Sequence, residues 1–432
     1  MQYEVVNTLR HGVGNWGDLD ELWTGSDYAY NSHHASLAGN QMRLALIEAV
    51  YDYKMSYLNE WRAAWSGIAE SVQPVNVLKA RDIASFKKEL HSFDLIVSLH
   101  SVNADSNAWL PKVESLFSDR TCPLVMFVGN EYSNPWLSTE VRLRHIKSVY
   151  PEIVATQLNL DSAEWLYRGT TSKVVAAPHG LPIGVKPSNL INRPIDFGMR
   201  GFRYPWFLLD DERNNILEAV EATVAALGGK VDSSNSHRFG HNEWFKFLGS
   251  TKITASSEAG SRYIFKTDDV WIPVLERLSR EGGTSRALGN DAKGMKVARQ
   301  LPAPVKSLLR KIAKTIGIEQ GSTAVFDSEF SAELRSLVKV EQFPHVDGKA
   351  LSSRHLDAIA TGTWQILKAG RYSDVLVPDI HYSAWDPSNG AGIVSDALQA
   401  FQDGRAEKAY ATLEANHSYS SRVKDILRDL NE

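Results

Sequence analysis

The chain has 432 residues, which is too long for a single hydrophobic core and sufficient for two. Hydrophobic residues make up 43% and charged residues 23%, a composition that excludes long disordered tracts. The formal net charge of −4 excludes a global positive field, so we expect no nucleic-acid partner. The lone Cys122 follows no pairing pattern and indicates a buried, inert thiol in a reducing compartment.

The N-terminal residues lack the charged and apolar segments of a signal peptide, and no apolar run approaches the length of a membrane span. We therefore expect a cytoplasmic protein.

The first half of the chain alternates short β-branched runs with helical patterns, which is typical of βαβ units and a parallel sheet. These units predict a Rossmann-like domain over residues 1–185. The predicted strands are residues 4–9, 75–78, 93–99, 124–128, 153–156 and 173–176. The predicted helices are residues 42–66, 83–91, 106–117, 138–149 and 161–168.

Residues 178–187 contain three prolines and two glycines and indicate a hinge. The α/β pattern then restarts and predicts a second Rossmann-like domain over residues 186–417, with an excursion at about 269–340 where the alternation is lost. A last helix, 418–432, is expected to return to the first domain. The predicted strands are 195–199, 230–232, 252–255, 365–367 and 374–377, and the predicted helices are 212–227, 242–248, 352–360, 393–403, 406–414 and 420–430.

The most specific motif lies at residues 352–382. A helix carrying Asp357 ends in Thr361-Gly362 and runs directly into a strand, and a Gly370-Arg-Tyr-Ser373 turn and His381-Tyr382 follow. This block resembles the nucleotide-binding helix of GT-B glycosyltransferases. It is most similar to bacterial group 1 or spore-maturation-like enzymes of cell-surface polysaccharide clusters. The resemblance implies two Rossmann-like, doubly wound domains facing a central cleft.

The resemblance assigns Asp357 to the ribose hydroxyls of a nucleotide, a role that acids play in dinucleotide sites. The alternative is a solvated helix acid. Retaining members of the wider family carry a glutamate eight positions earlier, where this chain has Lys349, so the retaining mechanism is not carried over.

The expected donor site includes further residues. Arg200 and Arg203 follow the first strand after the hinge, where guanidinium groups would stabilise a leaving diphosphate without a metal, or would form an ordinary surface pair. Glu258 would contact the donor sugar or cap its turn. The turn at Gly370 offers backbone N–H groups to a phosphate, unless it is a plain glycine turn. The motif adds Arg354, Tyr372, Ser373 and His381, although a lone histidine is by default a core residue.

The first domain is expected to hold the acceptor. His11 and Asp18 lie in a glycine-rich loop after the predicted first strand, and Glu131 follows another strand. Each is a candidate base for the acceptor hydroxyl. The alternatives are structural: His11 would cap a turn and Glu131 would order its loop.

Residues 293–314 carry seven cations and no acid, and an apolar helical face overlaps them. This pattern indicates an anionic membrane surface, consistent with a lipid-linked acceptor, or a core-facing helix with a solvated basic rim. Together the sequence predicts a metal-independent, cofactor-free enzyme. It would move sugar from a nucleotide-sugar donor to a surface-polysaccharide or lipid-linked glycan. The alternatives are a non-hydrolysing nucleotide-sugar epimerase and a non-catalytic glycan- or nucleotide-binding relative.

Overall fold

The computed structural model describes residues 42–50, 56–187, 193–201, 203–234, 239–280, 287–288, 319–320, 328–400 and 402–432. The predicted strand at 4–9, the base candidates His11 and Asp18, and the basic segment 293–314 lie outside the described residues.

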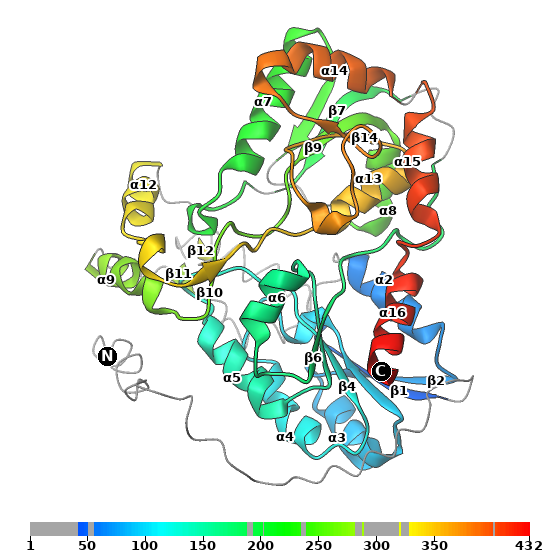
Figure 1. The fold of residues 1–432 in the computed structure, drawn as a ribbon, viewed down its shortest axis with the longest axis vertical. Helices are drawn as coiled ribbons and strands as arrows, with labels where there is room; N and C mark the ends of the chain where they lie inside the picture. Colours follow the sequence, from blue (N-terminus) through cyan, green and yellow to red (C-terminus); the bar gives the residue numbers. More distant parts are fainter. Residues whose placement is uncertain are drawn as a thin grey trace. The chain divides into compact units, whose positions relative to one another are not determined.

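The first half of the described chain forms a six-stranded, all-parallel sheet with the order β2-β1-β3-β4-β5-β6 (Figure 1). Strands β3, β4 and β5 in its middle are fully buried on both faces, as parallel strands covered by helices must be. The strands are β1 (Arg43–Glu48), β2 (Ser71–Asn76), β3 (Leu95–Ser98), β4 (Leu124–Phe127), β5 (Ile153–Thr156) and β6 (Lys173–Ala176).

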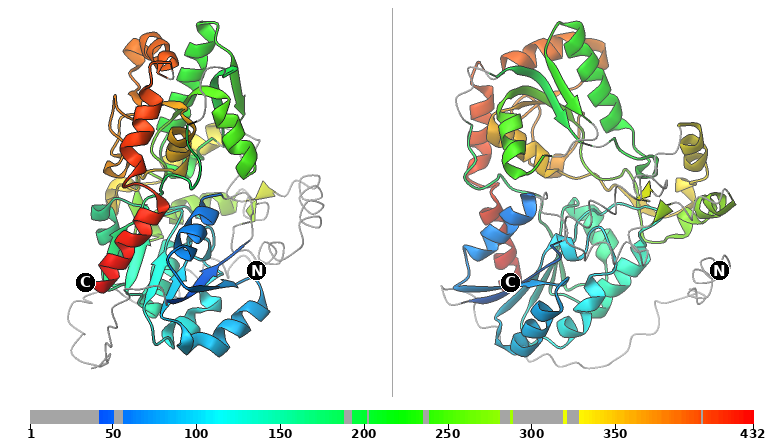
Figure 2. Two further views of the ribbon diagram at one scale, coloured as in Figure 1. Left: turned by 90° about the vertical axis from the view of Figure 1, so that its right-hand side faces the viewer. Right: turned by 180° about the vertical axis from the view of Figure 1, so that it is seen from behind.

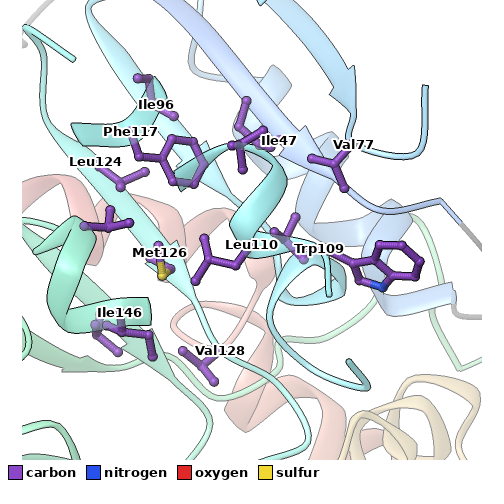
Figure 3. Close-up of a cluster of buried hydrophobic side chains, with 14 of the residues drawn as sticks. Ile47, Val77, Ile96, Trp109, Leu110, Phe117, Leu124, Met126, Val128 and Ile146 are labelled. Carbon is purple, nitrogen blue, oxygen red and sulfur yellow. The ribbon is translucent and has the colours of Figure 1, made fainter. Parts of the chain in front are cut away.

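Helices cover the two faces of this sheet and create two cores. Alternate strand residues enter opposite cores, because successive side chains of a strand point to opposite faces: Ile47 lies in one and Leu46 in the other. Figure 3 shows the first core, in which Ile47, Ile96 and Met126 meet Leu110 and Phe117. The helices are α2 (Ser56–Ser66), α3 (Ala80–Glu89), α4 (Glu114–Ser118), α5 (Thr139–Val149) and α6 (Leu160–Tyr167).

The C-terminal helix α16 (Tyr419–Asn431) belongs to the core of this first sheet. Its Tyr419, Val423 and Ile426 are buried with strand residues and with Trp61 of α2. Figures 1 and 2 show α16 beside α2. The return of the last helix, which the sequence predicts, therefore completes one of the two layers on the sheet.

The second sheet has five parallel strands in the order β15-β14-β9-β7-β8. Helices α7 and α14 pack in one core and α13 in another. The strands are β7 (Ile195–Arg200), β8 (Val231–Ser234), β9 (Thr251–Ser256), β14 (Trp364–Leu367) and β15 (Ser383–Ala384). The helices are α7 (Glu212–Ala226), α8 (His241–Gly249), α13 (Ser353–Thr361), α14 (Gly390–Gln399) and α15 (Arg405–Glu414).

Between β9 and α13 the chain builds small elements that contribute no strand to the five-stranded sheet within the described residues. Of these elements, β10, α9 and α12 share a core in which Trp271 and Phe265 meet Phe207. They are β10 (Ile264–Phe265), which pairs antiparallel with β13 (His345–Val346), α9 (Ile272–Arg280), α12 (Ser328–Ser336), and the parallel pair β11 (Ala287–Leu288) and β12 (Glu319–Gln320). The 3-10 turns are η1 (Leu90–Ser92), η2 (His100–Val102), η3 (Leu110–Lys112), η4 (Trp206–Leu208), η5 (Asp269–Trp271), η8 (Val340–Gln342), η9 (Tyr372–Asp374) and η10 (Pro387–Asn389).

The predicted fold class, two Rossmann-like α/β domains with parallel sheets, is confirmed by these topologies. No described helix is long and apolar enough to cross a membrane.

Three predicted elements are wrong. The helix predicted at 42–66 is β1 followed by α2, because its first apolar run is a fully buried central strand. The helix predicted at 106–117 breaks into η3 and α4, and Pro111 lies in η3. The strand predicted at 374–377 does not form, because Asp374 ends a left-handed turn with φ 56°.

The hinge passes close to the start of α16. Leu181 donates its N–H to the carbonyl of His417, and Ile183 donates to the Glu60 carboxylate at 2.8 Å. A Cβ on Gly180 would overlap the backbone N of Tyr419 and lie 2.5 Å from the carbonyl carbon of Ser418. Only glycine fits this crossing without movement of the backbone.

We therefore expect Gly180→Ala to destabilise the protein by about 1–3 kcal/mol, the usual cost of overpacking. Thermal unfolding measures the change. The matched control is Gly67→Ala, whose Cβ would make only ordinary contacts of 3.5 and 3.6 Å with backbone oxygens. Equal melting temperatures for the two variants would contradict the tight crossing.

Candidate functional site

Ligands of open parallel sheets bind beyond the carboxyl ends of the strands, so the loops after β7, β9 and β14 define the candidate site of the second sheet. Glu258 follows β9, and the Gly370–Asp374 turn follows β14. The helix α13 carries Arg354 and Asp357. The structure brings these separate segments into contact.

The Glu258 carboxylate holds the turn after β14. Its Oε1 accepts the N–H of Tyr372 at 2.6 Å, and a Cβ on Gly370 would overlap its Oε2. Burial is the main cause that raises the pKa of Glu258, and the backbone hydrogen bond opposes it. A backbone N–H of this turn is thus used by the protein's own carboxyl group, and binding of a phosphate by the turn stays a prediction.

The backbone of this turn is strained. Tyr372, Ser373 and Asp374 have φ angles of 48°, 55° and 56°, in the left-handed region that side chains other than glycine disfavour. Besides the hydrogen bond to Glu258, the turn is held by the Tyr372 hydroxyl, which donates to the carbonyl of Lys368 at 2.6 Å. The Ser373 hydroxyl accepts the N–H of Leu351 at 3.3 Å, just before α13.

Helix α13 has defined ends. The Ser352 side chain accepts the N–H of Arg354, and His355 Nδ1 accepts the N–H of Ser352 at 3.1 Å. Gly362 ends the helix in the left-handed conformation at φ 70°. The predicted run from an acidic helix through Thr-Gly into a central strand is thus formed.

Asp357 lies in the second turn of α13 and is 6% exposed. Trp244 of α8 donates its indole N–H to the Asp357 carboxylate at 2.9 Å. Burial raises the pKa of Asp357 to about 7, against the hydrogen bond from Trp244, and the negative charge of Glu60 adds to the rise. The carboxyl group therefore changes its protonation near neutral pH, unlike the solvated helix acid of the alternative interpretation.

Two guanidinium groups lie beside the end of β7. A Cβ placed on Gly201 would be 3.1 Å from an Nη atom of Arg213 and 3.2 Å from one of Arg354. Arg354 is among the predicted donor residues, and Arg213, in the first turn of α7, is not. Both positive charges lower the pKa of the buried His355 to about 3, although burial is the larger cause.

Lys349 is a buried lysine. Its ammonium group pairs with the Asp210 carboxylate and lies 3.3 Å from that of Glu212. These acids raise the pKa of Lys349 despite its burial. The site thus has a fixed ion pair at this position.

Arg200 and Arg203 both have acidic partners. Arg200 donates to the Asp232 carboxylate at 2.5 Å and stacks its guanidinium on Phe247 at 4.3 Å. Arg203 is 60% exposed and pairs with Glu218. Their assignment to the diphosphate stays a prediction, and both positions have the character of the alternative, a structural or surface ion pair.

His381 and Glu131 lie in internal hydrogen-bond networks. His381 Nδ1 accepts the N–H of Val377 at 2.8 Å, and its Nε2 lies 2.8 Å from the Thr412 hydroxyl. Glu131 accepts the Thr156 and Tyr167 hydroxyls, each at 2.5 Å. Burial raises the pKa of Glu131, and these hydrogen bonds oppose the rise. Glu131 orders its loop in this arrangement, and its role as a base stays a prediction.

Two buried histidines lie at the carboxyl end of the first sheet and were not among the predicted site residues. His100, after β3, is fully buried and stacks with His179 of the hinge at 6.0 Å between ring centroids. Burial lowers the pKa of His179 to about 3 and that of His100 well below its usual value, so both are neutral. No motif spacing in the sequence distinguishes His100 from a core residue.

Within the described ranges, no group of three or more His, Cys, Asp or Glu side chains is arranged to hold a metal ion.

The fold and these residues define a class: an α/β protein with two parallel sheets and a polar candidate site at the carboxyl edge of the second. No family model and no curated protein matches the chain. Among solved structures it is similar to HepE of Anabaena in complex with UDP and glucose, with a TM-score of 0.44 and 11% identity over 90% of this chain and 99% of that one.

The same protein in complex with UDP-glucose gives a TM-score of 0.43 and 12% identity over the same shares of both chains. A C2-type ketoreductase from a modular polyketide synthase gives 0.22 and 13% identity, over 85% of this chain and 78% of that one. Likenesses of this degree establish neither a family nor a function.

The raised pKa of Asp357 predicts a pH dependence of stability. The folded pKa of about 7 exceeds the ordinary value of 3.8, so the folded state holds this proton more tightly than the unfolded chain. The contribution of the Asp357 carboxyl group to the free energy of unfolding is largest below about pH 4. It is lost as the pH rises to about 7.

Asp357→Asn removes this titration and leaves an oxygen to accept from Trp244. We expect the variant to lose less stability than the wild type between pH 5 and pH 8, by on the order of 2 kcal/mol, since one pKa unit is worth about 1.4 kcal/mol. Urea unfolding at the two pH values measures the difference. Buried acids that do not interact with Asp357, such as Glu131, titrate alike in both proteins and cancel, whereas Glu60, whose charge acts on Asp357, is altered in the variant. Parallel pH profiles would contradict the raised pKa.

Proposed function

We propose that this protein is a glycosyltransferase that moves a sugar from a nucleotide-sugar donor to a surface-polysaccharide or lipid-linked glycan acceptor. One observation supports the proposal: three segments that carry expected donor-site residues contact one another beyond the ends of β9 and β14. Glu258 after β9 accepts the N–H of Tyr372 in the turn after β14, and this turn contacts Leu351 and His355 at the start of α13, the helix that carries Arg354 and Asp357.

Each group has a chemical part in the proposed reaction. The Asp357 carboxylate accepts hydrogen bonds from the ribose hydroxyls. When the bond between the sugar and the diphosphate breaks, its electron pair stays on the diphosphate oxygen, and fixed guanidinium groups stabilise that charge. The acceptor oxygen forms the new bond to the sugar. Its proton passes to a base of the first domain, for which His11, Asp18 and Glu131 are the candidates.

The acceptor substrate is proposed from the sequence of one segment. The seven cations of residues 293–314 motivate a lipid-linked acceptor at an anionic membrane surface, because charge and an apolar helical face together favour such surfaces. A cytoplasmic protein that binds the membrane peripherally would meet such an acceptor.

Nucleotide release from a panel of UDP-, GDP- and CDP-sugars tests the reaction class. A transferase slowly hydrolyses its donor without an acceptor and releases free nucleotide. An isomerised sugar would identify an epimerase instead, and tight binding without turnover would identify a non-catalytic relative. Failure to bind any of these donors would refute the proposal.

Asp357→Ala should weaken the nucleoside and the nucleoside diphosphate by the same factor, because both contain the ribose. Loss of one hydrogen bond to a charged group costs about 1.5–3 kcal/mol, or roughly ten- to a hundredfold in affinity. Calorimetric titration of both ligands measures the factor, and circular dichroism checks the fold. Unchanged affinity in a folded variant would remove Asp357 from the site.

A further inference from the structure

Arg213 has an unusual environment for an arginine. Its side chain lies in the first turn of α7 and is only 7% exposed. Within the described part of the chain, its guanidinium makes no hydrogen bond and no ion pair, and its buried Nε has no partner. Its one close polar contact is the Tyr204 ring, 4.8 Å from the guanidinium carbon. A buried charge without a partner is costly, so a compensating anion is expected.

The position in the helix adds to this cost. The start of an α-helix carries a partial positive charge, which disfavours a cation and favours an anion. Arg213 therefore does not stabilise α7 through its charge. The same field would help the helix end and the guanidinium bind a common negative group.

The acids nearest to Arg213 in the chain are already engaged. Asp210 and Glu212 both face the ammonium group of Lys349. Asp210 also accepts the N–H of Glu212 at 2.9 Å. Asp211, which lies between them, pairs with Arg335. None of these three acids therefore pairs with Arg213.

Arg354 brings a second guanidinium to the same place. Nη atoms of Arg213 and Arg354 lie 3.1 and 3.2 Å from the point where a Cβ of residue 201 would be, and residue 201 is a glycine. Any side chain there would fill the space between the two groups. Two like charges next to each other at a strand's carboxyl end suit a ligand with several anionic oxygens.

We propose that Arg213 and Arg354 together bind the diphosphate of the nucleotide donor, and that Gly201, without a side chain, lets both guanidinium groups lie against the end of β7. The inference rests on the proposed function and moves the diphosphate from the predicted Arg200 and Arg203 to this pair. Both of the predicted arginines already have acidic partners. Burial is the main cause that lowers the pKa of His355, and the positive charges of Arg213 and Arg354 lower it further, which agrees with two guanidinium groups close to this position.

The test compares Arg213→Met with the wild type, using inorganic diphosphate, UDP, GDP, CDP and the matching nucleosides as probes in calorimetry. The variant should bind diphosphates ten- to a hundredfold more weakly and nucleosides unchanged. It should also melt at a higher temperature than the wild type without ligand, because an unpaired buried charge has been removed. An arginine with a merely structural role would instead lower the melting temperature.

Two further variants keep the test independent of folding. Gly201→Ala keeps both charges but narrows the space, and should weaken diphosphates as well. Arg428→Gln removes an exposed arginine of α16 that is paired with Asp425, and should change neither binding nor melting temperature.

The outcomes separate the two proposals. Wild-type affinity for diphosphates in both Arg213→Met and Gly201→Ala, with nucleotide release intact, would overturn the assignment and leave the transferase standing. Loss of inorganic diphosphate binding in Arg213→Met, with no nucleotide or nucleotide sugar bound by the wild type, would support the anion site and refute the transferase. A wild type that binds neither diphosphate nor nucleotide would overturn both.

Discussion

The hydrogen bond from the Tyr372 amide to the Glu258 carboxylate joins residues 114 positions apart. It connects the ends of β9 and β14, which are neighbours in the second sheet. The three left-handed residues that follow are costly and persist only because their surroundings fix them. The turn in its fixed form packs the Tyr372 ring against His355, with ring centroids 5.1 Å apart. The start of α13 is therefore in contact with a turn that the Glu258 carboxylate holds.

Burial rather than charge pairing governs the ionisable groups of both sheets. Asp357, Glu131 and Glu258 each have a raised pKa, and burial is the largest cause in all three. Hydrogen bonds from Trp244, from hydroxyls or from backbone amides oppose that effect. Lys349 differs, because two acids outweigh its burial and keep it charged. The second sheet therefore has a fixed charge at Lys349 and, at Asp357, a carboxyl group that titrates near neutral pH.

The strands could be predicted where short apolar runs lie between turn residues. The bounds of β5 and β6 agree with the prediction for this reason. The strand and helix of residues 42–66 could not be told apart in the sequence. A buried strand and the buried face of a helix are both apolar, and the hydrophobic pattern does not separate them. The strand predicted at 374–377 rests on the apolar run of residues 375–377, and that run does not reveal the positive φ angles of Ser373 and Asp374 just before it.

The candidate site likewise contains residues that the sequence predicts and residues that it does not. Asp357, Glu258 and Tyr372 follow from the motif and from the ends of strands. Arg213 does not, since it ends an acidic run that is typical of a solvated helix start. The proposed anion-binding role of Arg213 depends on Lys349, which pairs with Asp210, 139 positions away in the sequence. A charge left without its partner is a property of three-dimensional neighbours, and no local pattern records it.

The return of α16 makes the first domain discontinuous in sequence. Tyr419, Val423 and Ile426 fill one core of the first sheet, although more than 200 residues of the second domain separate them from β6. A ribosome therefore completes the second sheet before it delivers the last layer of the first. Until α16 emerges, Trp61 and the strand residues beneath it lack their cover. Folding of the first domain is thus tied to completion of the whole chain, and a fragment ending at the hinge would leave that apolar face exposed.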